Sequence, residues 1–397
     1  MVLEIGYWMQ DVWEHVRVSQ ERKKLRRPGQ GFDYAQEKMA GRQVVSQLHP
    51  KRMRLRVKEI CQATPTAKTI RFERTDGPLP PFRAGQYVNV LVDVDGVLTS
   101  RPYSIASPPG SSYLELTVRD KPGGFVAPYL LNELKVGDEL KTTGPSGSFY
   151  HEPLIDGDDL VFLAGGSGIT PFMSIIRDAI QHNRPFKMHL LYGSRTLEDV
   201  IYADELAQLA DRPDFKYTLV ISELPPGHTG DHKGPPYLTG FLDAKLIHGQ
   251  IADVIGKTFY ICGPNVMYDF CLAALKELGV PPHKIRRELY GPPADVTKEP
   301  GWPEAVPAGT LFNVEIVGRV RRVIHAPAGE PLLNSLERYG IVVPAVCRSG
   351  ECSACRTRLV SGQVFMPART GLRASDRQHG YIHACVSYPL QDLQIRL

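Results

Sequence analysis

The sequence predicts three domains of different fold class: an antiparallel β-barrel, an α/β domain built on a parallel sheet, and a small C-terminal domain with a four-cysteine pattern. Short alternating strands run from Arg52 to about Phe149, whereas from Leu160 onward buried strands alternate with helical segments. A proline-rich stretch, residues 291–307, then separates the cysteine-containing end from the rest.

In the first domain, short segments alternate apolar and polar residues and are separated by turn residues. This pattern predicts antiparallel strands, and their number and spacing favour a barrel. The expected strands are residues 54–60, 69–74, 87–94 and 113–118.

The spacing of apolar residues along the chain changes in the second domain. Residues 160–164 form a continuous apolar run, as in a strand buried on both faces of a parallel sheet, and a glycine turn and a helix from Pro171 follow. Further strands are expected at 188–192, 215–221 and 258–262, and helices at 203–210 and 266–278.

Five prolines between Gly291 and Pro307 exclude a regular element and predict an extended, semi-stiff linker. Beyond it, the patterns predict a strand pair over 311–324, a helix over 331–339 and a terminal strand over 393–397. A strand pair, a helix, a cysteine loop and a final strand resemble the β-grasp fold of ferredoxins. The predicted divisions are 1–50 (an extension that matches no domain), 51–153, 154–291, the linker 292–309, and 310–397.

The composition is that of a globular protein in a reducing compartment. Of 397 residues, 42% are hydrophobic and 23% charged, the usual balance of a soluble protein. The sequence contains no apolar run of membrane-spanning length and no signal-peptide pattern at its N-terminus. Seven cysteines without a disulfide framework favour a reducing environment. We therefore expect a cytoplasmic protein without membrane contact, either a monomer or a dimer.

Basic residues gather at both ends of the chain. Residues 1–54 contain eleven Lys/Arg against six Asp/Glu, with a dense run at 22–27, and the segment from Thr310 contains eleven Arg against six acids. Such a run is compatible with a solvated face, with an acidic protein partner or with anionic lipid. No nucleic-acid-binding module is present in the sequence, so we expect no nucleic-acid partner.

The cysteine spacing is the most specific signal. Cys347, Cys352 and Cys355 follow the pattern Cys-x4-Cys-x2-Cys, and Cys385 comes thirty residues later. This is the plant-type [2Fe–2S] spacing, in which one tight loop supplies three thiolates and a distant element the fourth. The alternative is a zinc site, but zinc favours two separated Cys-x2-Cys or Cys/His pairs, and the sequence has no second pair.

Two motifs in the first domain suit a flavin. The segment Arg101-Pro102-Tyr103-Ser104 offers a guanidinium for a phosphate, an aromatic face and a hydroxyl donor, although an ordinary surface strand would also fit. The Gly123-Gly124 turn precedes a helix and exposes N–H groups suited to an anion, and it also fits an ordinary turn.

Two turns in the second domain suit a dinucleotide. Residues 165–171 follow a buried strand and open a helix, the setting of a phosphate-binding turn, but they lack the Rossmann spacing. Cys262, before Gly263-Pro264, stands at the end of a later strand. It is either a buried small hydrophobe or a residue facing the ligand crevice of an open α/β sheet.

Together these motifs resemble the ferredoxin–NADP reductase superfamily with a plant-type ferredoxin fused at the C-terminus. The resemblance covers residues 52–397. The domain order is similar to that of the reductase components of multi-component oxygenases, such as those of phenylacetyl-CoA epoxidase and phthalate dioxygenase, and to that of hybrid-cluster-protein reductases.

The resemblance implies roles for particular residues. Ser104, Cys262 and Glu288 would serve hydride transfer. Flavin contacts are implied for Arg101, Pro102, Tyr103, Ser104, Leu116, Thr117, Val118, Gly123, Gly124, Phe125 and Val126. Nicotinamide-dinucleotide contacts are implied for Gly166, Gly168, Thr170, Ser194, Arg195, Cys262, Gly263 and Pro264. Family members often have Ser or Thr where this chain has Ala127, so phosphate contact there would rest on backbone N–H groups.

The implied function is transfer of electrons from NAD(P)H through a flavin and the [2Fe–2S] cluster to an external one-electron acceptor protein. A flavin links a two-electron donor to a one-electron cluster. Because the phosphate turn lacks the arginine of FMN-containing oxygenase reductases, FAD is favoured over FMN; NADH and NADPH both stay open. The alternatives are an electron-transfer subunit of a stable complex and a non-catalytic redox sensor, and the sequence does not name the acceptor.

Overall fold

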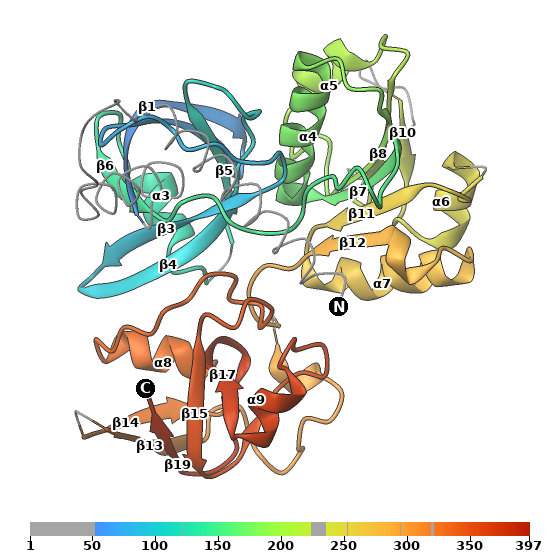
Figure 1. The fold of residues 1–397 in the computed structure, drawn as a ribbon. Helices are drawn as coiled ribbons and strands as arrows, with labels where there is room; N and C mark the ends of the chain where they lie inside the picture. Colours follow the sequence, from blue (N-terminus) through green and yellow to red (C-terminus); the bar gives the residue numbers. More distant parts are fainter. Residues whose placement is uncertain (1–51, 122, 224–235, 252, 294, 319–320) are drawn as a thin grey trace, which may run out of the picture. The chain divides into compact units, whose positions relative to one another are not determined.

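The computed structural model describes residues 52–397 except 122, 224–235, 252, 294 and 319–320 (Figure 1). The predicted extension 1–50 and its basic run at 22–27 lie outside the described residues. No helix in the described part is both long and apolar enough to cross a membrane.

The first domain is a six-stranded antiparallel sheet in the order β4-β3-β6-β1-β2-β5. The strands are β1 Met53–Thr64, β2 Ala67–Arg74, β3 Tyr87–Val94, β4 Val97–Ser104, β5 Leu114–Arg119 and β6 Glu139–Thr142. A bridge between Ile105 and Leu116 joins the two edges and closes the barrel. The short helix α3, Ala127–Asn132, buries Leu130 and Leu131 against the barrel core.

All four predicted barrel strands form, and the structure adds β4 and β6. A two-residue loop of Asp95 and Gly96, both at positive φ, joins β3 to β4. This is the tight hairpin connection that Asp-Gly favours, because both residues tolerate the left-handed region. The hairpin brings Arg101, Tyr103 and Ser104 onto a strand of the barrel.

The second domain is a parallel sheet in the order β10-β9-β8-β7-β11-β12. Its strands are β7 Asp159–Gly165, β8 Lys187–Ser194, β9 Phe215–Ile221, β10 Tyr237–Thr239, β11 Thr258–Cys262 and β12 Ile285–Glu288. Its helices are α4 Thr170–Gln181, α5 Ala203–Leu209, α6 Ala244–Gln250 and α7 Asn265–Glu277, with 3₁₀ turns η1 Gly166–Ile169 and η2 Pro282–Lys284.

Helices cover both faces of this sheet (Figure 1). Phe162 of β7 packs in the cluster formed with α4 and α5, whereas its neighbours Val161 and Leu163 pack in the cluster formed with α6 and α7. Residues along a strand point alternately to the two faces, so a doubly covered sheet requires a continuous apolar run. The strand order reverses between β7 and β11, and ligands of such sheets bind at the carboxyl ends of the strands at this point.

The third domain is a five-stranded sheet in the order β14-β13-β19-β15-β17, in which β13 and β19 are parallel. The elements are β13 Leu311–Val317, β14 Arg322–Pro327, α8 Leu332–Arg338, β15 Arg356–Ser361, α9 Ala374–Gln378, β17 Tyr381–His383, η4 Ala384–Val386 and β19 Leu393–Arg396. A small second sheet pairs β16 Val364–Phe365 with β18 Tyr388–Pro389. This arrangement confirms the predicted β-grasp domain.

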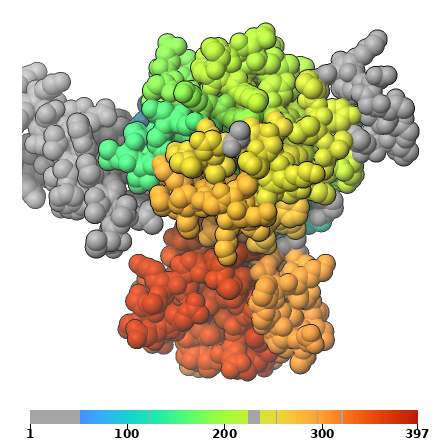
Figure 2. All heavy atoms as spheres, turned by 90° about the vertical axis from the view of Figure 1, so that its right-hand side faces the viewer, coloured from blue at the N-terminus to red at the C-terminus, as the bar shows by residue number. Residues whose placement is uncertain are grey.

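The linker departs from the prediction that it contains no regular element. It forms a 3₁₀ turn, η3 Val296–Lys298, and packs along the third domain (Figure 2). Trp302 contacts Phe365 and Tyr388 edge-on, with ring centroids 5.3 and 6.2 Å away. The prolines prevent a long helix or a strand, but aromatic burial still orders the segment.

Candidate functional site

The four predicted cluster cysteines converge although Cys385 is distant in sequence. Cys355 Sγ lies 3.2 Å from Cys385 Sγ, and neighbouring thiols of Cys352 and Cys385 lower the pKa of Cys347. The Cys352 N–H group donates to Cys347 Sγ at 3.4 Å, and the Ser349 N–H group donates to the same sulfur at 3.5 Å. Backbone N–H groups aimed at sulfur stabilise thiolates, so this donor set fits a [2Fe–2S] cluster.

Backbone conformation shapes the cysteine loop. Arg348, Gly350 and Ser353 all have positive φ, at 55°, 83° and 56°. A Cβ atom on Gly350 would lie 2.7 Å from the side chain of Val386, so only glycine fits there. His383, in turn, donates from Nδ1 to the carbonyl oxygen of Gly350 at 2.7 Å. The loop therefore wraps closely around the element that carries Cys385.

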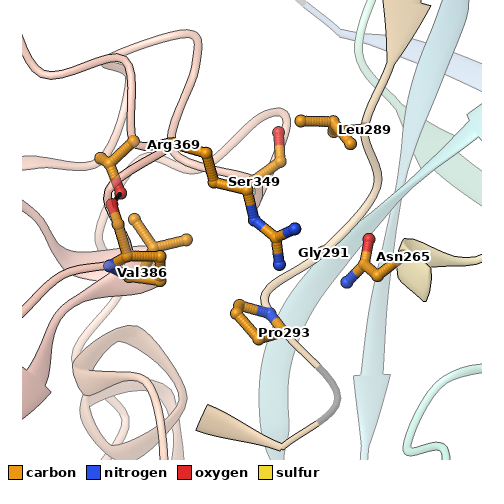
Figure 3. A pocket seen from close by; sticks show the side chains of 9 residues that line it. Asn265, Leu289, Gly291, Pro293, Ser349, Arg369 and Val386 are labelled. Atoms are coloured by element: carbon orange, nitrogen blue, oxygen red, sulfur yellow. Dashed lines mark hydrogen bonds between the residues drawn. The ribbon is translucent and has the colours of Figure 1, made fainter. Parts of the chain in front are cut away.

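A small pocket lies beside this loop, where the start of the linker meets the third domain (Figure 3). The side chain of Arg369 extends toward Gly291 and Asn265, and it also donates to Glu299 at 2.8 Å. Ser349, which follows the first two loop residues, lines the pocket with a hydroxyl that has no partner among the described residues. The pocket therefore lies where the start of the linker and the cysteine loop come together.

The predicted flavin motif lies on β4. Ser104 is buried and its hydroxyl oxygen lies 2.7 Å from Tyr290 Oη, across from the barrel in the α/β domain. Arg101 Nη1 donates to Thr99 Oγ1 at 2.6 Å and to the Ser100 carbonyl at 2.8 Å. The guanidinium of Arg101 is therefore already oriented by the protein.

The remaining predicted flavin residues differ in which of their groups are available to a flavin. Leu116 and Val118 pack their side chains in the barrel core, so only their backbones can line a flavin. Thr117 points the other way and its hydroxyl lies 2.5 Å from Tyr202 Oη. In the Gly-Gly turn, Gly123 has φ +70°. The Gly124 N–H group donates to the carbonyl oxygen of Lys121 at 2.7 Å. The prediction that this N–H group is free to bind an anion is therefore wrong. The turn ends at Phe125, which is exposed, and Val126, which is buried.

The two glycine turns of the parallel sheet meet at its switch point. A Cβ atom on Gly168 would lie 2.1 Å from the Cys262 carbonyl oxygen, and one on Gly165 would lie 2.8 Å from Pro264. Glycine is therefore required for the ends of β7 and β11 to approach this closely. Gly166 has φ +53°, and a Cβ atom at this position would meet the guanidinium of Arg119. That guanidinium pairs with Asp199 at 2.7 Å.

The other predicted dinucleotide residues lie around this point. The Thr170 hydroxyl donates to the Ser167 carbonyl at 2.7 Å and the Ser194 hydroxyl donates to the Thr196 carbonyl at 3.0 Å, so both are engaged within their turns. Arg195 is exposed, as is Pro264, while Gly263 is half-buried. The Gly263 N–H group donates to Tyr268 Oη at 3.2 Å.

Glu288 and Cys262 are direct neighbours, because β12 pairs with β11 in parallel and these residues share a register position. Burial raises the pKa of Glu288 to about 8, and its Oε2 atom has no hydrogen-bond partner among the described residues. Burial also raises the pKa of the Cys262 thiol. A buried carboxyl oxygen without a partner is costly, and this one is left available to a bound ligand.

Tyr290 and Tyr87 belong to this site although sequence reasoning assigned them no role. Tyr290 contacts Ser104, and Tyr87 packs edge-on against Tyr290 with ring centroids 6.0 Å apart. The one sequence signal that could have pointed to Tyr290 was its position two residues after Glu288. Arg119 was also missed, because nothing in its local sequence indicates that it faces Gly166.

The fold and the site together define an electron-transfer flavoprotein: a flavin barrel and a dinucleotide domain meet at Ser104 and Tyr290, and a loop with three thiols, joined by Cys385 of η4, follows in the same chain. Domain comparisons agree. Residues 55–151 match the oxidoreductase FAD-binding domain, residues 162–272 the oxidoreductase NAD-binding domain, and residues 315–390 the 2Fe-2S iron-sulfur cluster binding domain.

Similar proteins match the chain over most of its length. NADH oxidoreductase HCR of Escherichia coli is 31% identical over 341 residues, covering 86% of this chain and 96% of that protein. The glycine betaine monooxygenase reductase subunit of Chromohalobacter salexigens is 28% identical over 359 residues, covering 87% of this chain and 95% of that protein. The chain belongs to the ferredoxin–NADP reductase superfamily, in the group with a C-terminal plant-type [2Fe–2S] domain.

A solved structure shows the same fold. Phthalate dioxygenase reductase superimposes with a TM-score of 0.63 at 22% identity, covering 87% of this chain and 98% of that chain. The predicted three-domain fold, the oxidoreductase class and the cofactors FAD and [2Fe–2S] are thereby confirmed. The chain is an NAD(P)H-dependent reductase that passes electrons through FAD and the cluster to an external acceptor.

Proposed function

We propose that this enzyme uses NADH and serves as the reductase component of a multi-component oxygenase. The observation that carries the proposal is the junction of Ser104, Tyr290 and the Glu288 carboxyl group, whose Oε2 atom has no partner among the described residues, in a chain that also holds the four converging thiols. Relatives named as a monooxygenase reductase subunit and an NADH oxidoreductase support it.

The residue roles are part of the proposal. Arg101 holds the flavin phosphate, Ser104 and Tyr290 orient the flavin ring, and Glu288 and Cys262 position the nicotinamide. When bound, FAD would supply the conversion between a two-electron donor and a one-electron acceptor. The protein excludes water from this point, because Ser104, Glu288 and Cys262 are all buried. The domain boundaries 51–153, 154–291, 292–309 and 310–397 belong to the same proposal, with 1–50 as an additional segment.

The acceptor side of the enzyme is an exposed set of arginines, the arginine face, on β15, on and directly before α9, and on β19. It consists of Arg356, Arg358, Arg373, Arg377 and Arg396. Arg356 directly follows the cluster ligand Cys355 and lies 4.6 Å above the ring of Tyr381. Tyr381 pairs across the strands with Arg358, which pairs in turn with Arg396.

The charge of this face is largely uncompensated. Arg356 and Arg373 share Asp376, each at 2.9 Å, while Arg358, Arg377 and Arg396 form no ion pair with any residue that the structure describes. Like charges in directly opposed positions of a sheet are destabilising, so the Arg358–Arg396 pairing is retained at a cost. We propose that the acceptor presents an acidic surface to this face, which steers its approach to the cluster.

Two measurements test the function. Anaerobic NADH should bleach the FAD absorbance and then reduce the cluster, detected by electron paramagnetic resonance; NADPH should do so with a lower kcat/KM. Bleaching without cluster reduction would contradict the electron path. Reconstitution with oxygenase components then tests the partner class, and the proposal fails if none is reduced faster than cytochrome c.

The arginine face is tested with two haem proteins of opposite charge, the acidic cytochrome b5 domain and the basic cytochrome c. The double variant Arg358→Ser/Arg396→Ser should raise KM for cytochrome b5 at low ionic strength, and the effect should fade as salt screens the charges. Lys298→Ser removes an exposed linker cation and is the control. Equal KM values for cytochrome b5 in wild type and double variant would exclude this face as the docking surface.

A further inference from the structure

One threonine of the barrel joins the flavin strand to the cysteine loop. Thr99 of β4 donates from its hydroxyl to Glu337 Oε2 of α8 at 2.9 Å. The Thr99 hydroxyl oxygen also accepts hydrogen bonds from Arg101 at 2.6 Å and from Arg348 at 2.9 Å. A hydroxyl has one donor and two acceptor positions, and here all three are used. Thr99, Glu337 and Arg348 are each less than 7% exposed.

We call the group of Thr99, Arg101, Glu337 and Arg348 the Thr99 hub. Arg348 carries it into the cysteine loop. It stands directly after the ligand Cys347 and bonds Glu337 as well as Asn334 Oδ1, the latter at 3.2 Å. A second contact runs alongside, because the Ser100 hydroxyl donates to the carbonyl oxygen of Ala345 at 3.4 Å. The hub therefore connects a proposed flavin ligand, Arg101, to the loop that holds the cluster.

The hub contains one more positive than negative charge. The single carboxylate of Glu337 pairs with Arg348, whereas Arg101 is linked to it only through the shared Thr99 hydroxyl and through the attraction between their charges. Burial and the charge of Arg348 lower the pKa of Arg101 to about 10, against the opposing attraction of Glu337. An uncompensated buried charge is expensive, so an anion bound at Arg101 stabilises the whole arrangement.

We propose that the Thr99 hub couples flavin binding to the docking of the cluster domain. When the flavin phosphate compensates Arg101, the Glu337 carboxylate is left to Arg348, and the cysteine loop is held more firmly against β4. By linkage, a docked loop also strengthens flavin binding. Thr99, Glu337 and Arg348 are positioning residues in this scheme, which rests on the proposed contact between Arg101 and the flavin phosphate.

The test compares hydrogen–deuterium exchange in the full chain with its cluster intact, before and after FAD is restored to flavin-depleted protein. In the wild type, FAD should slow exchange in α8 and residues 345–349 by about tenfold, within the usual range for coupling between two sites. In Thr99→Val, FAD should still bind, but this protection should be lost. If Thr99 had only a structural role, Thr99→Val would raise exchange equally with and without FAD. The FAD-dependent difference in exchange therefore separates the two roles.

Two further variants complete the experiment. Glu337→Gln should also lose the FAD-dependent protection, whereas Glu330→Gln, which removes a carboxylate paired with Arg338 in the same domain, should retain it. Arg101→Gln should weaken FAD binding in a fluorescence titration; unchanged affinity would overturn the coupling. Full FAD-dependent protection in Thr99→Val would overturn it as well. NADH-dependent reduction of ferricyanide by the wild type tests the enzymatic function separately from both results.

Discussion

Ser104 and Tyr290 share a hydrogen bond of 2.7 Å although 186 residues separate them in the chain. The contact joins the end of a barrel strand to the segment after the last strand of the parallel sheet. In the proposed function, it lies where a flavin on the barrel and a nicotinamide at the sheet edge meet. Close alignment of the two reacting rings is the main task of such an enzyme, and this contact is one of several that join the two domains, with Arg119–Asp199 and Arg177–Glu115 among the others.

The cluster ligands are tested first. Cys352→Ser should abolish iron-sulfur absorbance and cytochrome c reduction, while NADH-dependent bleaching of FAD persists, because the flavin and dinucleotide domains do not need the cluster. Cys61→Ser changes an exposed thiol outside the loop and is the control. Purified wild type should contain two irons and two sulfides. Zinc without iron after anaerobic preparation would overturn the assignment.

Cys262→Ala tests the nicotinamide position. The buried thiol borders Glu288 in the sheet register, so its removal should slow FAD reduction at saturating NADH by about tenfold, the loss expected from one buried contact. Binding of NADH should change little. Cys271→Ala, which removes a second buried thiol from the same domain, is the matched control. Equal stopped-flow rates in wild type and Cys262→Ala would show that the role is wrongly assigned.

Glu288 predicts a pH dependence of stability. Burial raises its pKa to about 8 in the folded chain from an ordinary value of 4.5, so between these values the unfolded chain binds fewer protons than the folded one. The free energy of unfolding contributed by this group therefore falls as pH rises through this window. In flavin-free protein, Glu288→Gln should flatten the decline measured by urea unfolding, and Glu304→Gln, an exposed carboxylate, should not. Parallel curves for wild type and Glu288→Gln would contradict the shift.

Because the ends of β7 and β11 approach closely, we expect alanine to have opposite effects on stability at two glycines. Gly168→Ala places a Cβ 2.1 Å from the Cys262 carbonyl and should lower the free energy of unfolding by about 2–3 kcal/mol. Gly249→Ala, in helix α6 with open space around it, should raise stability by about 0.5 kcal/mol. Thermal unfolding measures both. A neutral Gly168→Ala would mean that the two turns are not in contact.

The basic segment at the N-terminus is tested by deletion of residues 1–50. NADH-dependent reduction of small acceptors should persist, while transfer to the natural acceptor should weaken, most at low ionic strength, because salt screens long-range attraction. Loss of FAD or a Tm lower by many degrees in the truncated protein would instead assign the segment a structural role.

Local signals account for much of the agreement between sequence and structure. The four predicted barrel strands and the four predicted parallel strands form because period-two alternation and continuous apolar runs act within a few residues. The strand β4 was missed, since Arg101 and Pro102 interrupt its alternation, although the Asp95-Gly96 turn before it was a usable signal. Packing of Trp302 orders the linker in a way that its prolines do not indicate.

The sequence by itself determined the cofactor chemistry of this protein, because Cys347, Cys352 and Cys355 must stand in one loop and because glycine turns after buried strands suit dinucleotides. Only the tertiary structure decided which distant residues meet: Tyr290 beside Ser104, and Glu337 on Thr99 across 238 residues. Such contacts depend on how completed domains pack against one another. Local spacing carries no information about that packing, whereas burial and hydrogen bonding in the folded chain select it.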